Sequence, residues 1–283
     1  MVAITALLYS KTAFEKAGIA ELPKTWDELL AAAEKLKGAG IIPMLTDFKD
    51  LWTIQYYFTE AKAFDGDPFY YNEMLKTDTP FTLDSPMGKG ALALKELVEK
   101  GYTENDLFST NWDQTKIDFG SGKGAMYFIG NWFLPQAAEL ANVDVSTMGM
   151  MPFPAPDSWG AKNVISLSPD WGLAINKNTK YPEAAKAVFK WYIEESGYEV
   201  LSGAASPLKT KESDIQAIKE LMEFNPTVYQ EGPSDPKFLE VYNKAEINWG
   251  AILAEAVTEP DMQAVFDKWN KKWADARKEV GIQ

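Results

Sequence analysis

Hydrophobic positions along the chain form short apolar runs that alternate with longer segments of helical periodicity. The apolar runs are bounded by glycine, proline and polar residues, and are typical of buried strands. They occupy residues 2–9, 41–46, 125–129, 148–151, 164–168 and 173–175. Because these predicted strands are few and interleaved with helices, the pattern predicts an α/β layered fold rather than a helical bundle or a sandwich.

The predicted helices are marked by their caps and by apolar positions three and four residues apart. Thr25 and Glu28 have the spacing of a capping box, which predicts a helix start. Ser85 and Pro86 have the order of an N-cap and a first-turn proline, and Gly101 should end that helix. Further helices are predicted over residues 11–18, 53–63, 112–120, 133–141, 182–194, 215–223, 236–257 and 261–280.

The stretch 119–132 carries the most information about a ligand site. It combines a glycine turn, a short buried strand and a second turn at Gly130-Asn131, and Trp132 stands where the next helix begins. A strand that runs into a helix start places backbone N–H groups beside the indole, and such groups receive oxygen-rich ligands. The stretch alone leaves open a second interpretation, in which Trp132 is a core residue at an ordinary strand–helix junction.

The charge of the chain limits its partners. The 283 residues carry a formal net charge of −13, and Arg277 is the single arginine. An acidic surface repels polyanions and one arginine offers little phosphate recognition, so nucleic acid is not expected as a partner. No apolar run has the length of a membrane span, so no inserted helix is expected, and residues 1–8 lack the basic region of a signal peptide.

The sequence contains neither cysteine nor histidine. Disulfides, thiolate nucleophiles, zinc–sulfur sites and histidine-based triads are therefore excluded. Asp65-Gly66-Asp67 is a weak calcium cue without the rest of an EF-hand loop, so a plain turn is favoured. We expect no cofactor and no metal. Carboxylate or lysine chemistry, hard-cation binding, and binding without chemistry remain.

Two groups of tryptophans differ in their surroundings in the sequence. Trp191, Trp269 and Trp273 fall in predicted helices and are expected to be structural. The members of the second group stand in or beside polar loops, or follow an amide; they are Trp52, Trp112, Trp132, Trp171 and Trp249, with Asp50, Asp113, Asn131 and Asp170 close by. Aromatic rings against the C–H faces of sugars, with amides and carboxylates on the hydroxyls, are the expected chemistry of a carbohydrate site.

The carboxylates near these tryptophans also admit an enzyme. Two of Asp50, Asp113 and Asp170 could form the pair of a glycoside-active hydrolase, which requires two carboxyl groups at a defined separation across a sugar bond. The sequence does not give that separation. We favour binding without chemistry, so the chain is not expected to be an enzyme.

Three segments, taken in order, resemble one protein family. Tyr9-Ser-Lys-Thr-Ala-Phe14 with Pro23-Lys-Thr-Trp26 looks like the segment by which extracellular solute-binding proteins of sugar ABC transporters enter their second lobe. Residues 119–132 are similar to the family's F-x-x-G-K-x-A-M…G-x-W motif, and residues 171–185 resemble its return segment. The resemblance covers essentially the whole chain and is to family 1, the maltose-binding-protein-like group.

This resemblance implies a periplasmic-binding-protein-like α/β fold of type II, in which crossover strands join two lobes around a ligand cleft. It also implies a carbohydrate ligand, an extracytoplasmic location, and delivery to the membrane subunits of an ABC permease without chemistry on the ligand. The same fold binding a non-sugar ligand, such as a peptide or a polyamine, remains an alternative. A cleft dominated by acids rather than tryptophans would favour that alternative.

The resemblance also carries site residues over to this chain. Trp132 matches the tryptophan that meets the sugar from the second lobe. Trp171 with Asp170 falls on the crossover that borders the cleft, and Trp52 with Asp50 on a loop that often supplies an aromatic. Two weaker transfers complete the set, with Asn131 beside Trp132; they are Trp249 on a late helix, and Trp112 with Asp113.

The sequence departs from the family pattern at its start, where a secretory signal and most of the first lobe are expected. Residues 1–167 and 213–283 are expected to form a complete second lobe, and 168–212 a remnant of a truncated first lobe. The apolar face of the helix over 182–194 would then lack cover, which predicts half a binding site, weak affinity and self-association. That face consists of Ala185, Val188, Phe189, Tyr192 and Ile193.

Overall fold

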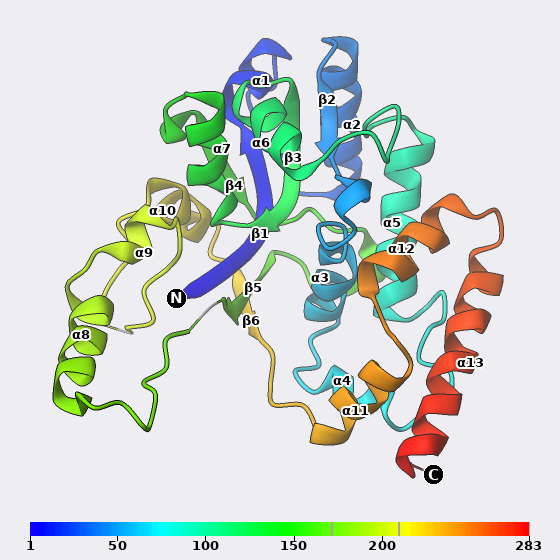
Figure 1. Ribbon diagram of the computed structural model, residues 1–283. Helices are drawn as coiled ribbons and strands as arrows, with labels where there is room; N and C mark the ends of the chain where they lie inside the picture. Colours follow the sequence, from blue (N-terminus) through cyan, green and yellow to red (C-terminus); the bar gives the residue numbers. More distant parts are fainter. Residues whose placement is uncertain (171, 209, 283) are drawn as a thin grey trace.

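The computed structural model describes residues 1–170, 172–208 and 210–282. A six-stranded sheet lies at its centre, with helices on both sides (Figure 1). The strands are β1 (Val2–Ser10), β2 (Ile42–Leu45), β3 (Gly124–Gly130), β4 (Met148–Met151), β5 (Val164–Pro169) and β6 (Thr227–Gln230). The α-helices are α1 (Lys11–Lys16), α2 (Trp26–Gly38), α3 (Tyr56–Asp65), α4 (Tyr70–Met74), α5 (Pro86–Glu99), α6 (Trp112–Gly120), α7 (Phe133–Ala141), α8 (Pro182–Glu194), α9 (Tyr198–Leu201), α10 (Gln216–Glu223), α11 (Pro236–Lys244), α12 (Trp249–Thr258) and α13 (Met262–Val280). Short 3-10 helices are η1 (Phe48–Asp50), η2 (Val145–Thr147) and η3 (Asp157–Trp159).

The direction of the strands fixes where a ligand can bind. The sheet order is β2-β3-β1-β5-β6, and β4 pairs with the second half of β1. β1 is antiparallel to β3, β4 and β5, whereas β2 is parallel to β3 and β6 to β5. The carboxyl ends of β2, β3, β5 and β6 therefore lie at one edge, together with the start of β1. In open α/β sheets this edge is where ligands bind.

Capping side chains set the helix starts that the sequence predicts. The capping box at Thr25 and Glu28 is formed at the start of α2. The Ser85 hydroxyl accepts the Gly88 N–H at 3.3 Å at the start of α5. Asn111 accepts the Gln114 N–H at 3.0 Å at the start of α6. Each cap satisfies an N–H group that has no partner within its helix.

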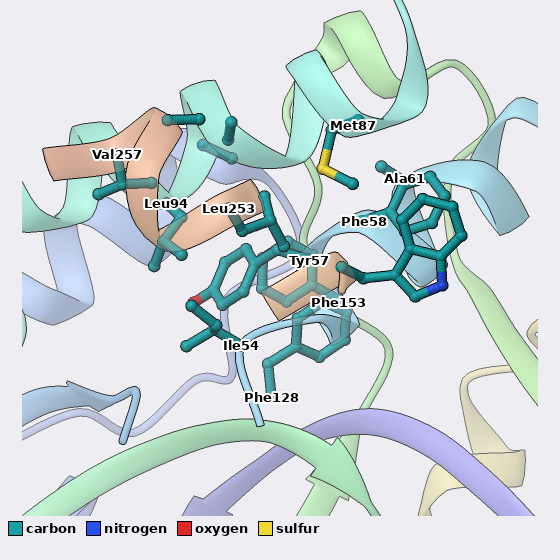
Figure 2. Close-up of a cluster of buried hydrophobic side chains, with 14 of the residues drawn as sticks. Ile54, Tyr57, Phe58, Ala61, Met87, Leu94, Phe128, Phe153, Leu253 and Val257 are labelled. Carbon is teal, nitrogen blue, oxygen red and sulfur yellow. The ribbon is translucent and has the colours of Figure 1, made fainter. Parts of the chain in front are cut away.

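The larger core fills the space between one face of the sheet and a layer that includes α3, α5 and α12. Figure 2 shows Phe58 of α3, Leu94 of α5 and Leu253 of α12 converging there. Phe128 of β3 stacks on Phe153 with ring centroids 4.1 Å apart. On the opposite face, α6, α7 and α10 cover a second cluster, which includes Phe119, Phe133, Leu221 and the strand residue Tyr127. Because helices cover both faces of the sheet, side chains on both sides of most strands are buried, and the sequences of those strands are nearly continuous apolar runs.

Several elements differ from those predicted. The strands, and most helices, are confirmed within a few residues, but the predicted strand at 173–175 does not form. Leu173 is 45% exposed, and no described strand lies beside it to supply the hydrogen bonds that a strand requires. One strand, β6, and two short α-helices, α4 and α9, were not predicted, and neither were the three 3-10 helices. β6 was missed because its residues follow a proline and only Tyr229 is buried, so no apolar alternation marks it.

The helix predicted over residues 236–257 is two helices. Glu246 has a left-handed φ of +53°, which breaks the helical path after α11. Asn248 then caps α12 by accepting the Ala251 N–H at 3.0 Å. Trp249 is therefore the first residue of a new helix rather than an interior residue of a long one, and this corrects its predicted setting.

Helix α8 carries the apolar face that the sequence analysis predicts to be left uncovered by other elements. All of its residues belong to the described part of the chain, and none of them is buried. Val188 is 63% exposed and Trp191 is 52% exposed, so Trp191 is a surface side chain rather than the structural one predicted. Figure 1 shows α8 and α9 on the side of the sheet away from α11 and α13. Within the described ranges, no helix combines the length and apolar character needed to cross a membrane.

Candidate functional site

Three of the tryptophans that the sequence analysis predicts as ligand contacts meet at the carboxyl edge of the sheet. The rings of Trp52 and Trp112 lie 4.9 Å apart, between centroids, in an edge-on arrangement. Trp132 stacks on Trp52 at 6.0 Å with an interplanar angle of 28°, and lies 5.8 Å from Trp112. We call these three residues the tryptophan cluster. Residues far apart in the sequence thus form one aromatic surface, because they follow β2, begin α6 and follow β3.

A tight loop brings Trp52 to this surface. Asp47 and Leu51 both adopt left-handed φ angles, of +53° and +54°. The Thr53 hydroxyl closes the loop by donating to the carbonyl oxygen of Thr46 at 3.1 Å and to that of Asp47 at 2.8 Å. Left-handed backbone at a non-glycine residue costs energy and is found where the surrounding structure imposes it, often at functional sites.

Asp50 joins this loop to the tryptophan cluster. Its carboxylate accepts the backbone N–H of Trp112 at 2.8 Å, at the start of α6. The negative charge there is favourable because it faces the positive end of the helix dipole. The Lys116 ammonium lies 4.8 Å from the centroid of the Trp112 ring and pairs with Asp113 at 2.8 Å. Through its hydrogen bond to the Trp112 backbone, Asp50 positions the tryptophan cluster. The Asp113 side chain, by contrast, is 75% exposed.

Both polar groups of the Asn131 side chain form hydrogen bonds within the protein. Its side-chain oxygen accepts the Ile4 N–H at 2.8 Å and its amide donates to the carbonyl oxygen of Gly203 at 2.6 Å. The residue is only 1% exposed. Asn131, predicted as a ligand contact, thus joins β1 and the loop after α9 to the end of β3. The structure gives it a positioning role next to Trp132.

Trp132 and Asp170 line one cavity of about 450 Å³, which we call the Trp132 cavity. Its other lining residues come from α7 and from α9 with the residue after it; they are Pro135, Gln136, Glu139, Tyr198, Leu201 and Ser202. No described side chain caps the N-terminus of α7, which starts directly after Trp132. The volume falls in the roughly 300–1,000 Å³ range of small-molecule sites. Partial burial raises the pKa of Asp170 above its ordinary value.

A buried acid lies at the start of the Trp52 loop. Asp47 is fully buried, and neither of its carboxylate oxygens has a hydrogen-bond partner among the described residues. Burial, together with the nearby carboxylates of Asp50 and Glu104, raises the pKa of Asp47 to about 7. Glu104 is held by the N–H and hydroxyl of Thr46, at 2.9 and 2.7 Å. The described residues contain no group of three or more acidic side chains arranged to hold a metal ion.

The remaining predicted residues lie elsewhere or outside the described chain. Trp249 is 8% exposed and packs in the core, 4.7 Å from the ring of Phe58 and 5.3 Å from that of Tyr242. Its described ring contacts are with core aromatics rather than with the tryptophan cluster, although the next residue, Gly250, adjoins the Leu51 carbonyl. Trp171 lies outside the described residues.

Sequence reasoning missed the residues that α7 and α9 contribute to the cavity. Gln136 and Glu139 lie one and two helical turns after Trp132, so the predicted helix over 133–141 already placed them on its face. That spacing was an available signal. Tyr198 and Leu201 had none, because α9 is a single turn and was not predicted.

Comparison with known proteins identifies the family. Bacterial extracellular solute-binding proteins match residues 1–199 of the chain. The chain belongs to this family. Its fold is the periplasmic-binding-protein-like α/β fold of type II that the family resemblance implies, here with a mixed sheet.

The solute-binding protein is similar to several characterised relatives. It is 21% identical over 193 residues to the multiple sugar-binding protein of Streptococcus mutans, covering 66% of this chain and 44% of that protein. It is 28% identical over 226 residues to the sn-glycerol-3-phosphate-binding periplasmic protein UgpB of Brucella melitensis, covering 74% of this chain and 49% of that one. The chain spans about half the length of these curated relatives.

A solved structure covers nearly the whole chain. BlMnBP1, the binding protein of an ABC transporter from Bifidobacterium animalis subsp. lactis in complex with mannobiose, superposes with a TM-score of 0.79 at 27% identity. The alignment covers 98% of this chain and 69% of that one. The same protein in complex with mannotriose gives a TM-score of 0.77 at 26% identity.

Proposed function

We propose that this protein is the substrate-binding component of an ABC importer and that it binds a sugar or oligosaccharide in the Trp132 cavity. The observation that carries the proposal is the tryptophan cluster, whose Trp132 member lines a cavity shared with the carboxylate of Asp170. A flat apolar ring can pack against the C–H face of a sugar, while a neighbouring carboxylate accepts hydrogen bonds from its hydroxyl groups. Family membership and the saccharide complexes of BlMnBP1 support the proposal.

The proposed contacts follow from where the side chains lie. Trp132 stacks on a sugar ring, and Asp170 accepts a hydrogen bond from a sugar hydroxyl, as would Gln136 or Glu139 of α7. Trp52 and Trp112 support the Trp132 ring, with Trp52 37% exposed and able to extend the surface. Trp171 is proposed as a further ligand residue on the sequence resemblance alone.

The proposal includes the partners and location of the whole protein. The ligand is passed to the membrane subunits of a permease without chemistry, and the protein works outside the cytoplasmic membrane, as the family's description as extracellular supports. Residues 1–167 and 213–283 are proposed to form one lobe, and 168–212 to belong to the other.

The uncovered face of α8 supports self-association of this chain. Val188 and Phe189 border an open hollow of about 410 Å³ together with the exposed Leu173 and Ile175. We expect the chain to elute larger than a monomer at high concentration, and Val188→Glu to shift it to the monomer position. A monomeric elution of the unaltered chain at every concentration contradicts this.

Titration of the protein with mannobiose and mannotriose tests the carbohydrate proposal. Calorimetry and intrinsic tryptophan fluorescence should both give saturable binding up to millimolar sugar. Trp132→Ala should abolish it, whereas Trp191→Ala, which removes an exposed indole on α8, should leave it intact. The proposal fails if a folded sample binds neither sugar, or if Trp132→Ala binds as well as the unaltered protein.

The hydrolase alternative has one observation in its favour. Glu139 and Asp170 are both carboxylates that line the Trp132 cavity, and hydrolysis of a glycosidic bond uses two carboxyl groups facing one ligand. The other two acids of the predicted set have partners within the protein: Asp50 is hydrogen-bonded to Trp112 and Asp113 is paired with Lys116. We expect no release of mannose from mannotriose. Turnover that is lost in Asp170→Asn would establish an enzyme instead.

A further inference from the structure

A second cavity lies where α3 faces β5 and β6. Its volume is about 180 Å³, and we call it the Glu60 cavity. Ser168 lines it, while Asp170, two residues further along the chain, lines the Trp132 cavity. Two residues of an extended strand span about 7 Å. The two cavities are therefore neighbours at the carboxyl edge of the sheet, and Tyr56, which lines the Glu60 cavity, is close enough to Asp170 to be affected by its charge.

The walls of the Glu60 cavity are rich in hydroxyl groups and aromatic rings. Thr5, Thr59, Ser166 and Ser168 provide aliphatic hydroxyls, and tyrosine rings line much of the remainder. The Ser166 hydroxyl donates to the carboxylate of Glu60 at 2.6 Å. Glu60 is only 3% exposed, so an acceptor with a preset hydrogen bond faces the cavity from within the protein. This combination of apolar ring faces and placed polar groups suits a polyhydroxylated ring.

The charges of the cavity do not favour an anion. Lys62 is 2% exposed, forms an ion pair with Glu231, and its ammonium lies 4.0 Å from the centroid of the Tyr71 ring. Its positive charge is thus already neutralised by the carboxylate and further stabilised by the ring. With Glu60 as the second acid, a phosphate group would meet carboxylates without an uncommitted cation among the described lining residues.

The size of the cavity limits what it can hold. At about 30 Å³ for each water, it has room for about six water molecules. It is smaller than the roughly 300 Å³ at which sites for a whole ligand begin. One unit of a larger ligand is therefore a better match than a complete ligand.

We propose that the Glu60 cavity is a second subsite that takes one neutral sugar unit of the ligand bound at Trp132, and that it rejects phosphorylated ligands because its described lining offers no uncommitted cation. This inference rests on the proposed function, since it requires a saccharide at Trp132. It assigns the ligand to neutral oligosaccharides, unlike the ligand named for the relative UgpB. The unit is held by hydrogen bonds to Glu60 and Ser166 and by the tyrosine walls.

Two independent variants test the subsite. Ser168→Phe places a ring at the exposed lip of the cavity, and Glu60→Gln changes an acceptor deep inside it. Both should lower the affinity for mannotriose by about tenfold or more, which corresponds to ~1.4 kcal/mol. Ser158→Phe, at an exposed serine of η3, is the matched control and should change nothing. Thermal melting confirms that each variant is folded.

The outcomes separate this inference from the proposed function. If the unaltered protein binds mannotriose or mannobiose, and neither Ser168→Phe nor Glu60→Gln weakens either sugar, the subsite is wrong while the proposed function stands. If the unaltered protein binds neither sugar, the proposed function fails and the subsite fails with it. sn-Glycerol 3-phosphate serves as the anionic probe, and binding of it as tight as that of mannotriose overturns the assignment to neutral ligands.

Discussion

The indole of Trp132 lies folded back against the backbone of Gly130. A Cβ atom at residue 130 would stand 2.3 Å from the indole Nε1 of Trp132, well inside van der Waals contact. Gly130 has no left-handed φ, so its importance is the space above its Cα rather than backbone freedom. The glycine two residues before the tryptophan is therefore what allows the indole its place in the tryptophan cluster.

Gly130→Ala should displace the Trp132 indole and weaken sugar binding by about tenfold or more, since a gap of about an ångström forfeits up to about half of the dispersion energy of each ring contact. Fluorescence titration with mannotriose measures the effect, and the emission of the unbound protein should shift because the indole environment changes. Gly38→Ala is the control: a Cβ there meets nothing within 4 Å. Unchanged affinity and emission in Gly130→Ala would contradict the proposed geometry.

Trp112→Leu should weaken mannotriose binding less than Trp132→Ala does. Trp112 packs against Trp52, Trp132 and Phe133, but it does not line the Trp132 cavity. Loss of a supporting ring should reduce affinity by about threefold to tenfold through a less ordered Trp132. Calorimetry on the two variants gives the ranking. Loss of binding in Trp112→Leu with retention in Trp132→Ala would reverse the proposed roles.

Asn131→Ala should lower the free energy of unfolding by about 2–4 kcal/mol. The change leaves the Ile4 N–H and the Gly203 carbonyl without their buried partner, and each such group costs roughly 1–3 kcal/mol. Urea unfolding followed by fluorescence measures the change. Asn105→Ala, at an exposed amide, is the control. The Asn131 variant should also bind sugar less well, because Leu201 and Ser202, which directly precede Gly203, line the Trp132 cavity.

Stability should fall as pH rises from about 5 to about 8. The pKa of Asp47 is raised from 3.8 to about 7 and that of Glu60 from 4.5 to about 7, in both cases chiefly by burial. Between those values the folded protein binds more protons than the unfolded chain. The contribution of each carboxyl is therefore fully present below its unfolded pKa and is lost as pH rises through about 7.

Asp47→Asn isolates one of the two groups. Asparagine tolerates the left-handed φ at this position and carries no charge, so it mimics the protonated acid. The melting temperature should rise by a few degrees at pH 8 and change little at pH 5. Asp84→Asn, at an exposed carboxyl, should show neither effect. A melting temperature of Asp47→Asn that parallels the unaltered protein across this range would show that Asp47 does not titrate as inferred.

The sequence allowed prediction of those parts of the fold that local signals determine. The capping residues Thr25, Ser85 and Asn111 act on N–H groups within their own first turn, so their spacing alone locates the helix starts. Trp249 was misplaced because Asn248 resembles an interior residue when the preceding turn at Glu246 is not recognised. Residues 173–175 are as apolar as a buried strand. An apolar run forms a β-strand only where a neighbouring strand supplies its backbone hydrogen bonds, and the run itself does not reveal whether such a neighbour exists.

The candidate site was predictable by residue type but not by contact. Trp52, Trp112 and Trp132 were each chosen for a polar neighbour, and nothing in their spacing says that their rings touch. Asn131 was chosen for its amide, whose two groups turn out to be used by β1 and Gly203. Such roles depend on partners 127 and 72 residues away, which no local pattern encodes.

The pairing of β1 has a consequence for how the chain folds. β1 begins at Val2, yet its partners are residues such as Ile129 for Ala6 and Leu167 for Ile4. Contacts between residues so distant in sequence close large loops and slow the search for the native state. During synthesis β1 is made long before β3, the earliest of the strands that pair with it, so its backbone stays without a strand partner until then. A chaperone that binds extended apolar segments would find its substrate in residues 2–10 of the nascent chain.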